Sequence, residues 1–231
     1  MSLDSARLDT ALNTARTALL AERVAEGYWE GELSSSALST AVACAAMQHV
    51  QTATGTEEHC ALIQGGLHWL AEHANADGGW GDTTKSLSNI STTTLCWATF
   101  HAVPGALEEH AEVVAAAEQW LTKAAGGVTP DYLAPAIIAR YGKDRTFSVP
   151  ILTHCALAGK GRWKDVIQLP FELAALPRNW FAALRLPVVS YALPALIAIG
   201  QCRHQHRPSW NPFTRVLRNA AREKTLQVLE Q

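Results

Sequence analysis

Acidic side chains that could supply a proton are spread thinly along this chain. A carboxylic acid stays protonated, and so can donate a proton, when other carboxylates are held beside it. The seven aspartates never form such a cluster: Asp4, Asp9, Asp77, Asp82, Asp131, Asp144 and Asp165. No Gly-x-Ser-x-Gly segment marks a nucleophilic serine. The sequence therefore predicts no catalytic residue.

Zinc ligands are the next chemistry to consider. Asp82, Cys96 and His101 occur in an order that could hold zinc, which binds Asp, Cys and His side chains. The short Asp-x-Cys spacing that would present two ligands together is missing. His154 and Cys155 are adjacent, so on a helix their side chains point about 100° apart and do not easily share an ion. No metal site and no cofactor are predicted, and zinc binding stays open only as an alternative.

The elements that would position any site follow an internal repeat. The segment Gly27-Tyr28-Trp29-Glu30-Gly31 is echoed by Asp77-Gly78-Gly79-Trp80-Gly81, and the two tryptophans lie 51 residues apart. Ala18-Leu19 precedes the first segment as Trp69-Leu70 precedes the second. A third, decayed copy begins at Trp120-Leu121, but Val128 stands where its turn tryptophan would be. A period of this length is typical of repeat arrays.

The periodicity of apolar residues predicts an all-α fold, since strand alternation is almost absent. Helices are expected over 5–25, 34–50, 58–74, 90–103, 107–125, 130–142 and 148–159. They come in pairs joined by polar, glycine-containing links, and each pair can bury its apolar face only against the next. The last twenty residues are expected to form a basic surface helix.

The segment from Trp163 to Gly200 is apolar but broken by four prolines: Pro170, Pro177, Pro187 and Pro194. About 20 apolar residues suffice to cross a bilayer. The internal prolines and Arg185 instead favour a buried or interfacial position.

The composition of the chain limits the classes of protein to which it can belong. With 231 residues, 48% hydrophobic and 17% charged, the chain can bury a sizeable core. A net charge of −2 gives no positive field for nucleic acid. The N-terminus lacks the pattern of a secretory signal. Five cysteines without a Cys-x-x-Cys pair indicate reduced, buried thiols and a cytoplasmic location: Cys44, Cys60, Cys96, Cys155 and Cys202.

The two Gly-x-Trp turns, Arg145-Thr146-Phe147-Ser148 and the proline-rich block together resemble the N-terminal portion of squalene-hopene cyclases, which are class II triterpene cyclases. The family repeat, called the QW motif, places a Gln before Gly-x-Trp, whereas Val24 and Ala74 stand there in this chain. The resemblance implies an α/α toroid, here an incomplete α6-α6 barrel, with residues 1–210 as the domain and 211–231 as a basic helix or linker. Its structural repeat residues are Trp29, Trp69, Gly78, Gly79 and Trp80, and the indoles of Trp29 and Trp80 are expected to be buried at their turns.

The family's catalytic acid sits in an Asp-x-Asp-Asp motif on a second toroid, and this chain has no such motif. The resemblance therefore implies a non-catalytic domain that supports hopanoid cyclisation of a squalene-like isoprenoid with a catalytic domain or partner chain. Two alternatives stay open. One is a non-enzymatic toroid that binds isoprenoid lipid or protein, and the other is a zinc prenyltransferase-like protein.

The resemblance also suggests contact residues. Ile151 and Tyr191 would line the hydrocarbon cavity. Trp180, Phe181 and Leu184 would form a monotopic membrane contact, flanked by arginines, on the inner face of the plasma membrane.

Overall fold

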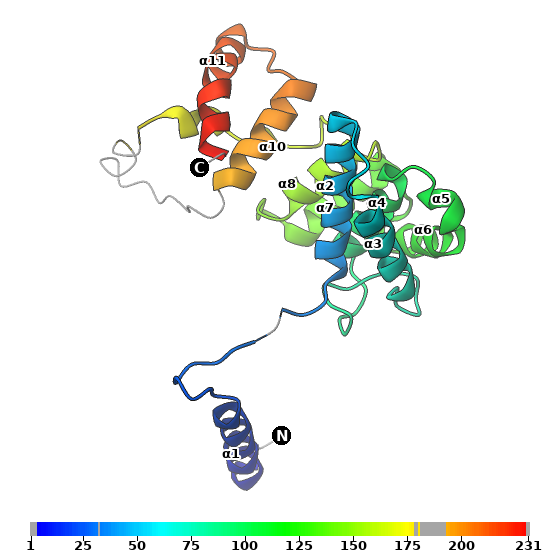
Figure 1. Cartoon of the computed structure of the whole chain (residues 1–231), viewed down its shortest axis with the longest axis vertical. Coiled ribbons are helices and arrows are strands. Elements are labelled where there is room, and N and C mark those ends of the chain that lie inside the picture. The colour runs from blue at the N-terminus through cyan, green and yellow to red at the C-terminus, as the bar shows by residue number, and fades with distance from the viewer. Residues whose placement is uncertain (1–3, 32, 178–179, 181–192, 230–231) are drawn as a thin grey trace. The chain divides into compact units, whose positions relative to one another are not determined.

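The computed structural model describes residues 4–31, 33–177, 180 and 193–229. These residues form ten α-helices and one short 3-10 helix, with no strand among them (Figure 1). The helices are α1 Ser5–Ala21, α2 Ala37–Thr54, α3 Cys60–Glu72, α4 Ile90–Ala102, α5 Ala106–Glu109, α6 Ala111–Ala125, α7 Pro130–Tyr141, α8 Ser148–Leu157, η1 Phe171–Ala175, α10 Leu193–His206 and α11 Pro212–Leu229. The predicted all-α class is confirmed. Phe181, Leu184 and Tyr191 lie outside the described residues.

The chain divides into two compact units, one ending at Ser35 and the other beginning at Ser36. The first unit consists of α1 and the turn that carries Trp29. The second contains all the other helices, including α11.

Local sequence signals account for several helix ends. The Ser36 hydroxyl accepts a hydrogen bond from the Ser39 backbone N–H, and Gly55 ends α2 in the left-handed conformation with φ 71°. The Asn89 side chain accepts from two backbone N–H groups at the start of α4. The expected helix over 107–125 is instead two helices, because His110 leaves the helical conformation between α5 and α6. Its ring lies 5.3 Å from that of Phe100 in α4, a packing contact that the apolar periodicity does not indicate.

Helix α4 lies at the centre of the second unit. All ten residues from Ser91 to Phe100 are buried, as expected of a helix surrounded by others. Helices α2, α6 and α8 pack on α4, and α3 packs on α2. Small residues allow this approach: a Cβ at Gly66 of α3 would come within 2.3 Å of the Cys44 Sγ of α2. This layered packing of helices is the arrangement of an α/α toroid, and the predicted fold class is confirmed.

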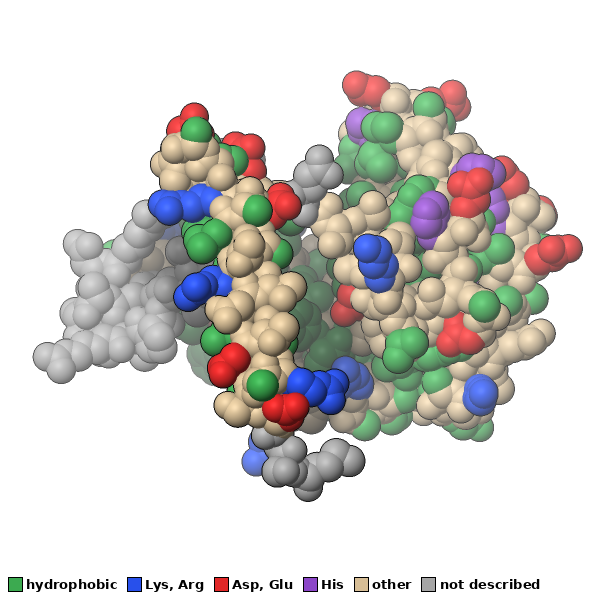
Figure 2. Space-filling view, turned by 90° about the horizontal axis from the view of Figure 1, so that it is seen from below, with side chains coloured by type: hydrophobic (Ala, Val, Ile, Leu, Met, Phe, Trp, Pro, Cys, Tyr) green, Lys and Arg blue, Asp and Glu red, His purple; other side chains and the backbone are tan. Residues whose placement is uncertain are grey.

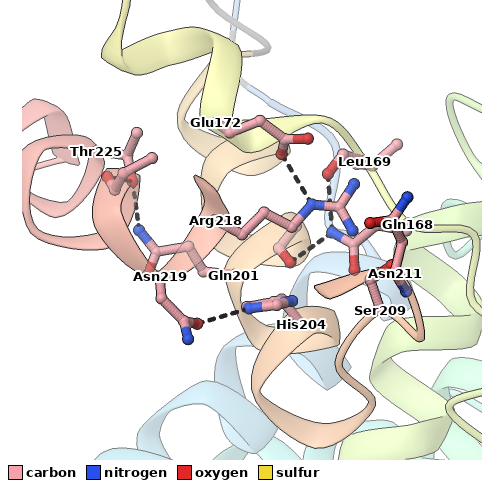
Figure 3. A network of polar contacts seen from close by, with 12 residues as sticks. Gln168, Leu169, Glu172, Gln201, His204, Ser209, Asn211, Arg218, Asn219 and Thr225 are labelled. Atoms are coloured by element: carbon pink, nitrogen blue, oxygen red, sulfur yellow. Dashed lines mark hydrogen bonds and ion pairs between the residues drawn. The ribbon is translucent and has the colours of Figure 1, made fainter. Parts of the chain in front are cut away.

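The C-terminal helices form their own packed group. Helices α10 and α11 lie side by side and both contact η1 (Figure 1). Polar contacts fix this group (Figure 3): Glu172 pairs with Arg218 at 3.1 Å, and Gln201 donates to the Thr225 hydroxyl at 2.7 Å. Helix α11, predicted as a surface helix, is therefore anchored along one side.

Three contacts join this group to the segment that follows α8. The rings of Trp163 and His206 stack with centroids 4.3 Å apart. The Arg203 Nε donates to the Val166 carbonyl at 2.9 Å. Gln168 donates to the Gly200 carbonyl at 2.8 Å.

Candidate functional site

The two tryptophan turns make the same side-chain hydrogen bond. The Trp80 indole N–H donates to the Leu70 carbonyl at 2.9 Å. The Trp29 indole N–H donates to the Leu19 carbonyl at 2.6 Å. Both bonds span ten residues, so each turn folds back onto the last turn of the helix before it.

The backbone of the two turns also agrees. The matching bonds run from Asn75 N to Gly79 O, at 2.8 Å, and from Val24 N to Tyr28 O, at 2.9 Å. Gly78 and Gly27 adopt φ values of 86° and 92°, which side chains other than glycine rarely adopt. At Gly78 space is a second constraint, because a Cβ would lie 2.8 Å from the Ala116 carbonyl oxygen. The repeat is thus preserved in atomic detail.

The two indoles differ in burial. Trp80 is 1% exposed and its ring lies 6.2 Å from that of Phe100 in α4. Trp29 is 46% exposed, and its ring is flanked by the Arg23 guanidinium at 5.6 Å. The expectation of a buried indole is correct for Trp80 and wrong for Trp29. The reason is that the first unit buries no residue of α1, so it offers Trp29 no core to enter.

Asp77 connects the second turn to the third repeat copy. One oxygen accepts from the Ser88 hydroxyl at 2.6 Å and from the Gly79 N–H at 3.1 Å. The other accepts from the Trp120 indole at 3.0 Å. These donors, Ser88 first, hold the pKa of Asp77 below its ordinary value. Asp77 is therefore a fixed anion and not a proton donor.

The Asp82 carboxylate, at the other end of the turn, is also held by hydrogen bonds. It accepts from the Thr92 hydroxyl at 2.6 Å and from the Asn89 amide at 2.9 Å. The Thr92 bond, followed by the Asn89 bond, lowers the pKa of Asp82. Both aspartates of the turn are thus structural acceptors: Asp77 ties the turn to Ser88 and to Trp120 of α6, and Asp82 ties it to the start of α4.

A helical repeat turn of this kind, whose two aspartates are held as anions, is what the resemblance predicts for the N-terminal part of a cyclase. The sequence model of the family described as the squalene-hopene cyclase N-terminal domain matches residues 12–193. The chain belongs to this family. Comparison with curated proteins and with solved structures gives no match.

The candidate zinc ligands of this cyclase N-terminal domain have other partners. Asp82 is held as described, and burial raises the pKa of the Cys96 thiol well above its ordinary value. His101 lies against the Trp97 ring at 4.7 Å and 3.6 Å from a Glu118 oxygen. Among the residues that the structure describes, no three His, Cys, Asp or Glu side chains gather as a metal site would require.

His154 takes part in a buried network that sequence reasoning missed. Its Nε2 lies 3.2 Å from the Leu95 carbonyl, which can only accept, so this nitrogen carries the proton. The Thr99 hydroxyl lies 3.1 Å from the same nitrogen and 3.0 Å from the Ala41 carbonyl. Burial lowers the pKa of His154 to about 4, so the ring is neutral at pH 7. The network joins α2, α4 and α8 and is structural.

The cysteines of the domain divide by burial. Three are buried, namely Cys44, Cys96 and Cys155, and burial raises the pKa of Cys155 to about 12. Cys60 is exposed and Cys202 is half-buried. The prediction that all five are buried is therefore wrong for these two. Cys60 is the first residue of α3 and Cys202 lies in α10, outside the main core.

The predicted cavity and membrane residues are only partly described. Ile151 is buried in the hydrophobic core of the domain. Trp180 is 59% exposed, which suits a contact surface. Nothing in the described structure bears on Tyr191, Phe181 or Leu184. None of the helices described reaches the length and apolar content that crossing a bilayer demands.

A polar cavity of about 220 Å³ lies between α10 and α11. It is lined by Phe171, Gln201, Cys202, His204, Gln205, Asn219 and Arg222. Its volume falls below the roughly 300–1,000 Å³ of typical small-molecule sites. A long isoprenoid would not fit in this volume.

Charged side chains of both signs are scattered over the face of the domain seen in Figure 2. This distribution agrees with the net charge of −2. It offers no broad basic field on that face for nucleic acid.

Proposed function

We propose that this domain is the non-catalytic N-terminal part of a class II terpene cyclase and acts with a catalytic toroid to cyclise a squalene-like isoprenoid to a hopanoid skeleton. The single observation that carries this proposal is the family match over residues 12–193. The hydrogen bonds of Asp77 and Asp82 support the division of labour, because both carboxylates are held as anions. Because this sequence contains no Asp-x-Asp-Asp motif, the proton donor would come from the catalytic toroid, on the same polypeptide or on a partner chain.

The surface of α1 is where we place the contact with that toroid. Leu12 and Leu19 of α1 are exposed, at 62% and 58%. Their counterparts 51 residues later are Ile63 and Leu70 of α3, which are buried in the contact with α2. The turn after α1 makes the same tryptophan hydrogen bond as the turn after α3. By this likeness α1 has the features of an outer repeat helix, whose apolar side must be covered by an inner helix. An inner helix of the catalytic toroid would supply that cover.

We further propose that Ile151 and Tyr191 belong to the wall of the hydrocarbon cavity, and that Trp180, Phe181 and Leu184 contact the inner face of the plasma membrane. The exposure of Trp180 supports the membrane contact. Vesicle sedimentation of the wild type against Trp180→Asp with Phe181→Asp tests it. Equal binding of the two proteins would remove the proposal.

The decisive experiment is incubation with squalene, alone and with a candidate partner that carries Asp-x-Asp-Asp, followed by product analysis. We expect cyclised product only with both proteins. Leu12→Asp with Leu19→Asp should lower complex formation and product together, whereas Leu62→Asp, at another exposed leucine, should leave both unchanged. Product from the domain alone would contradict the proposal.

A non-enzymatic isoprenoid- or protein-binding toroid is the second candidate. It is favoured by the same fixed carboxylates, since Asp77 and Asp82 are held as anions. Tight squalene binding without product in the presence of every Asp-x-Asp-Asp partner would support it. Stoichiometric bound zinc would instead favour the prenyltransferase-like alternative.

A further inference from the structure

The cavity between α10 and α11 gathers polar side chains from both helices. Helix α10 contributes Gln201, Cys202 and His204 to its lining, and α11 contributes Asn219 and Arg222. Its volume of about 220 Å³ is below that of sites for drug-sized ligands, but it leaves room for several water molecules. All five residues lie beyond residue 193, where the family match ends. The cavity therefore falls largely outside the matched domain.

The two helices that enclose this cavity are tied to each other and to η1. Gln201 of α10 donates to the Thr225 hydroxyl of α11 at 2.7 Å (Figure 3) and to the Arg222 backbone carbonyl at 3.1 Å. The ion pair between Arg218 and Glu172, at 3.1 Å, joins α11 to η1. Because the walls are already held in place, a ligand would bind without paying to order them.

His204 brings an unsatisfied acceptor to the cavity. The side chain is 8% exposed, and its Nε2 lies 2.9 Å from the Asn219 amide oxygen (Figure 3). An amide oxygen can only accept, so Nε2 carries the proton and Nδ1 of the neutral ring is an acceptor. Nδ1 is buried and has no hydrogen-bond partner in the part of the chain that the structure describes. A buried polar atom without a partner is rare and points to a missing donor.

Positive charge accumulates around the same cavity. Arg222 is exposed, and its guanidinium makes no ion pair or hydrogen bond with any described residue. Burial, followed by repulsion from Arg207 and Arg218, lowers the pKa of Arg203 on α10. Glu172 already pairs with Arg218. A ligand with a negative group would therefore be attracted to this site.

We propose that the cavity binds a small hydroxycarboxylate, with its carboxylate on Arg222 and its hydroxyl on His204. A guanidinium matches a carboxylate because it can donate two parallel hydrogen bonds. The ligand hydroxyl would donate to Nδ1 of His204 and so supply the missing donor. Phe171, which also lines the cavity, offers the carbon chain an apolar contact. The site does not depend on the proposed cyclase role.

Other occupants match the lining less well. A hydrocarbon would leave both Arg222 and His204 without partners. Inorganic phosphate would bind Arg222 but leave much of the cavity to water. Water alone would satisfy Nδ1 of His204 but not the positive charge. For a metal ion, the described residues bring no three His, Cys, Asp or Glu side chains together.

Cys202 provides a direct measure of occupancy, because it lines the cavity and is half-buried. The full chain is treated with iodoacetamide in the presence of lactate, malate or citrate, and labelling of each cysteine is followed by mass spectrometry. At least one of the three should slow the labelling of Cys202 about tenfold when it exceeds its Kd tenfold. We expect that Kd to be about 1 mM or below. Labelling of Cys60, which is exposed on α3, should not change.

Isothermal titration tests the two predicted contacts separately. The best of the three ligands is compared with its analogue that lacks the hydroxyl, namely propionate, succinate or tricarballylate. The analogue should bind roughly five- to tenfold more weakly, and His204→Phe should remove this preference. Arg222→Gln should weaken binding of both at least about tenfold. Arg215→Gln, at an exposed arginine of α11 that does not line the cavity, is the matched control and should leave binding unchanged.

Three outcomes would overturn the proposal. The first is labelling of Cys202 that none of the three ligands slows. The second is equal affinity of Arg222→Gln and the wild type. The third is binding of inorganic phosphate as tight as that of the best hydroxycarboxylate, which would make the cavity a simple anion site. Circular dichroism checks the fold of each variant, and Arg222→Gln changes only an exposed side chain, so the test stands even where His204→Phe does not fold.

Discussion

Trp120 donates its indole hydrogen bond to Asp77 at 3.0 Å, across 43 positions of the sequence. This bond links the decayed third copy of the repeat to the turn of the second. The third copy has lost its turn tryptophan to Val128, yet Trp120 still contributes to the repeat array by anchoring the turn before it.

Replacement of Trp120 and Asp77 tests this link by a double-mutant cycle. Trp120→Phe and Asp77→Asn should each destabilise the domain, and together by less than the sum, with a coupling of about 1 kcal/mol. Urea unfolding measures each free energy of unfolding. The Asp77 carboxylate should contribute to the free energy of unfolding at neutral pH. This contribution should be lost as the pH falls below the ordinary pKa of 3.8, because the folded-state pKa of Asp77 is lower. Additive single effects would show that the bond is not formed in solution.

The two repeat tryptophans should differ sharply in their contribution to stability. Trp80→Ala removes a fully buried indole and should cost about 3–5 kcal/mol. Trp29→Ala removes a half-exposed indole and should cost about 1 kcal/mol or less in the isolated domain. Thermal and urea unfolding of both variants provide the comparison. A similar loss in each would mean that Trp29 is buried in solution.

Gly78 and Gly105 form a matched pair for the turn backbone, since both have positive φ, 86° and 80°. Gly105→Ala should destabilise the domain by only about 1–2 kcal/mol, the cost of holding alanine at a positive φ, because its Cβ would face open space. Gly78→Ala adds a clash with the Ala116 carbonyl at 2.8 Å and should cost at least about 2 kcal/mol more. The urea midpoints report the difference. Equal midpoints would contradict the close approach at Gly78.

The lowered pKa of His154 should make the stability of the domain depend on pH. Its folded-state pKa of about 4 lies below the ordinary value of 6.5, so the unfolded chain binds more protons between these values. The free energy of unfolding should therefore be unaffected above pH 6.5 and fall by about 3 kcal/mol as the pH drops toward 4.

His154→Leu should flatten this slope, because Thr99 keeps its bonds to the Ala41 and Leu95 carbonyls without the imidazole. His68→Gln, at an exposed position of α3, is the control and should retain the slope. Urea unfolding from pH 4 to 7 measures it. An unchanged slope in His154→Leu would assign the pH dependence to other groups.

The cysteines should react with a thiol reagent in order of exposure. Cys60 should react first and Cys202 more slowly. Cys44, Cys96 and Cys155 should react only on unfolding, because they are buried and burial raises the pKa of each thiol. Mass spectrometry of partially labelled protein gives the order. Rapid labelling of Cys96 in the folded domain would contradict the described core.

Much of the fold could be predicted from sequence because its signals are local. Apolar periodicity, capping residues and prolines give the helices, and the spacing of 51 residues between Trp29 and Trp80 gives the repeat. The paired hydrogen bonds of the two turns follow from the same local pattern, since each tryptophan bonds a carbonyl only ten residues away. The absence of clustered aspartates can likewise be read directly along the chain.

Burial could not be predicted in this way, because it depends on how the helices pack against one another. Trp29 and Trp80 share one turn geometry, yet only Trp80 lies beneath α4. His110 interrupts an otherwise regular helix where its ring meets Phe100, and His154 loses its basicity because α2, α4 and α8 enclose it. Local patterns thus specify the elements and their turns, whereas packing sets which side chains leave water, and with them the protonation states and exposed surfaces of the domain.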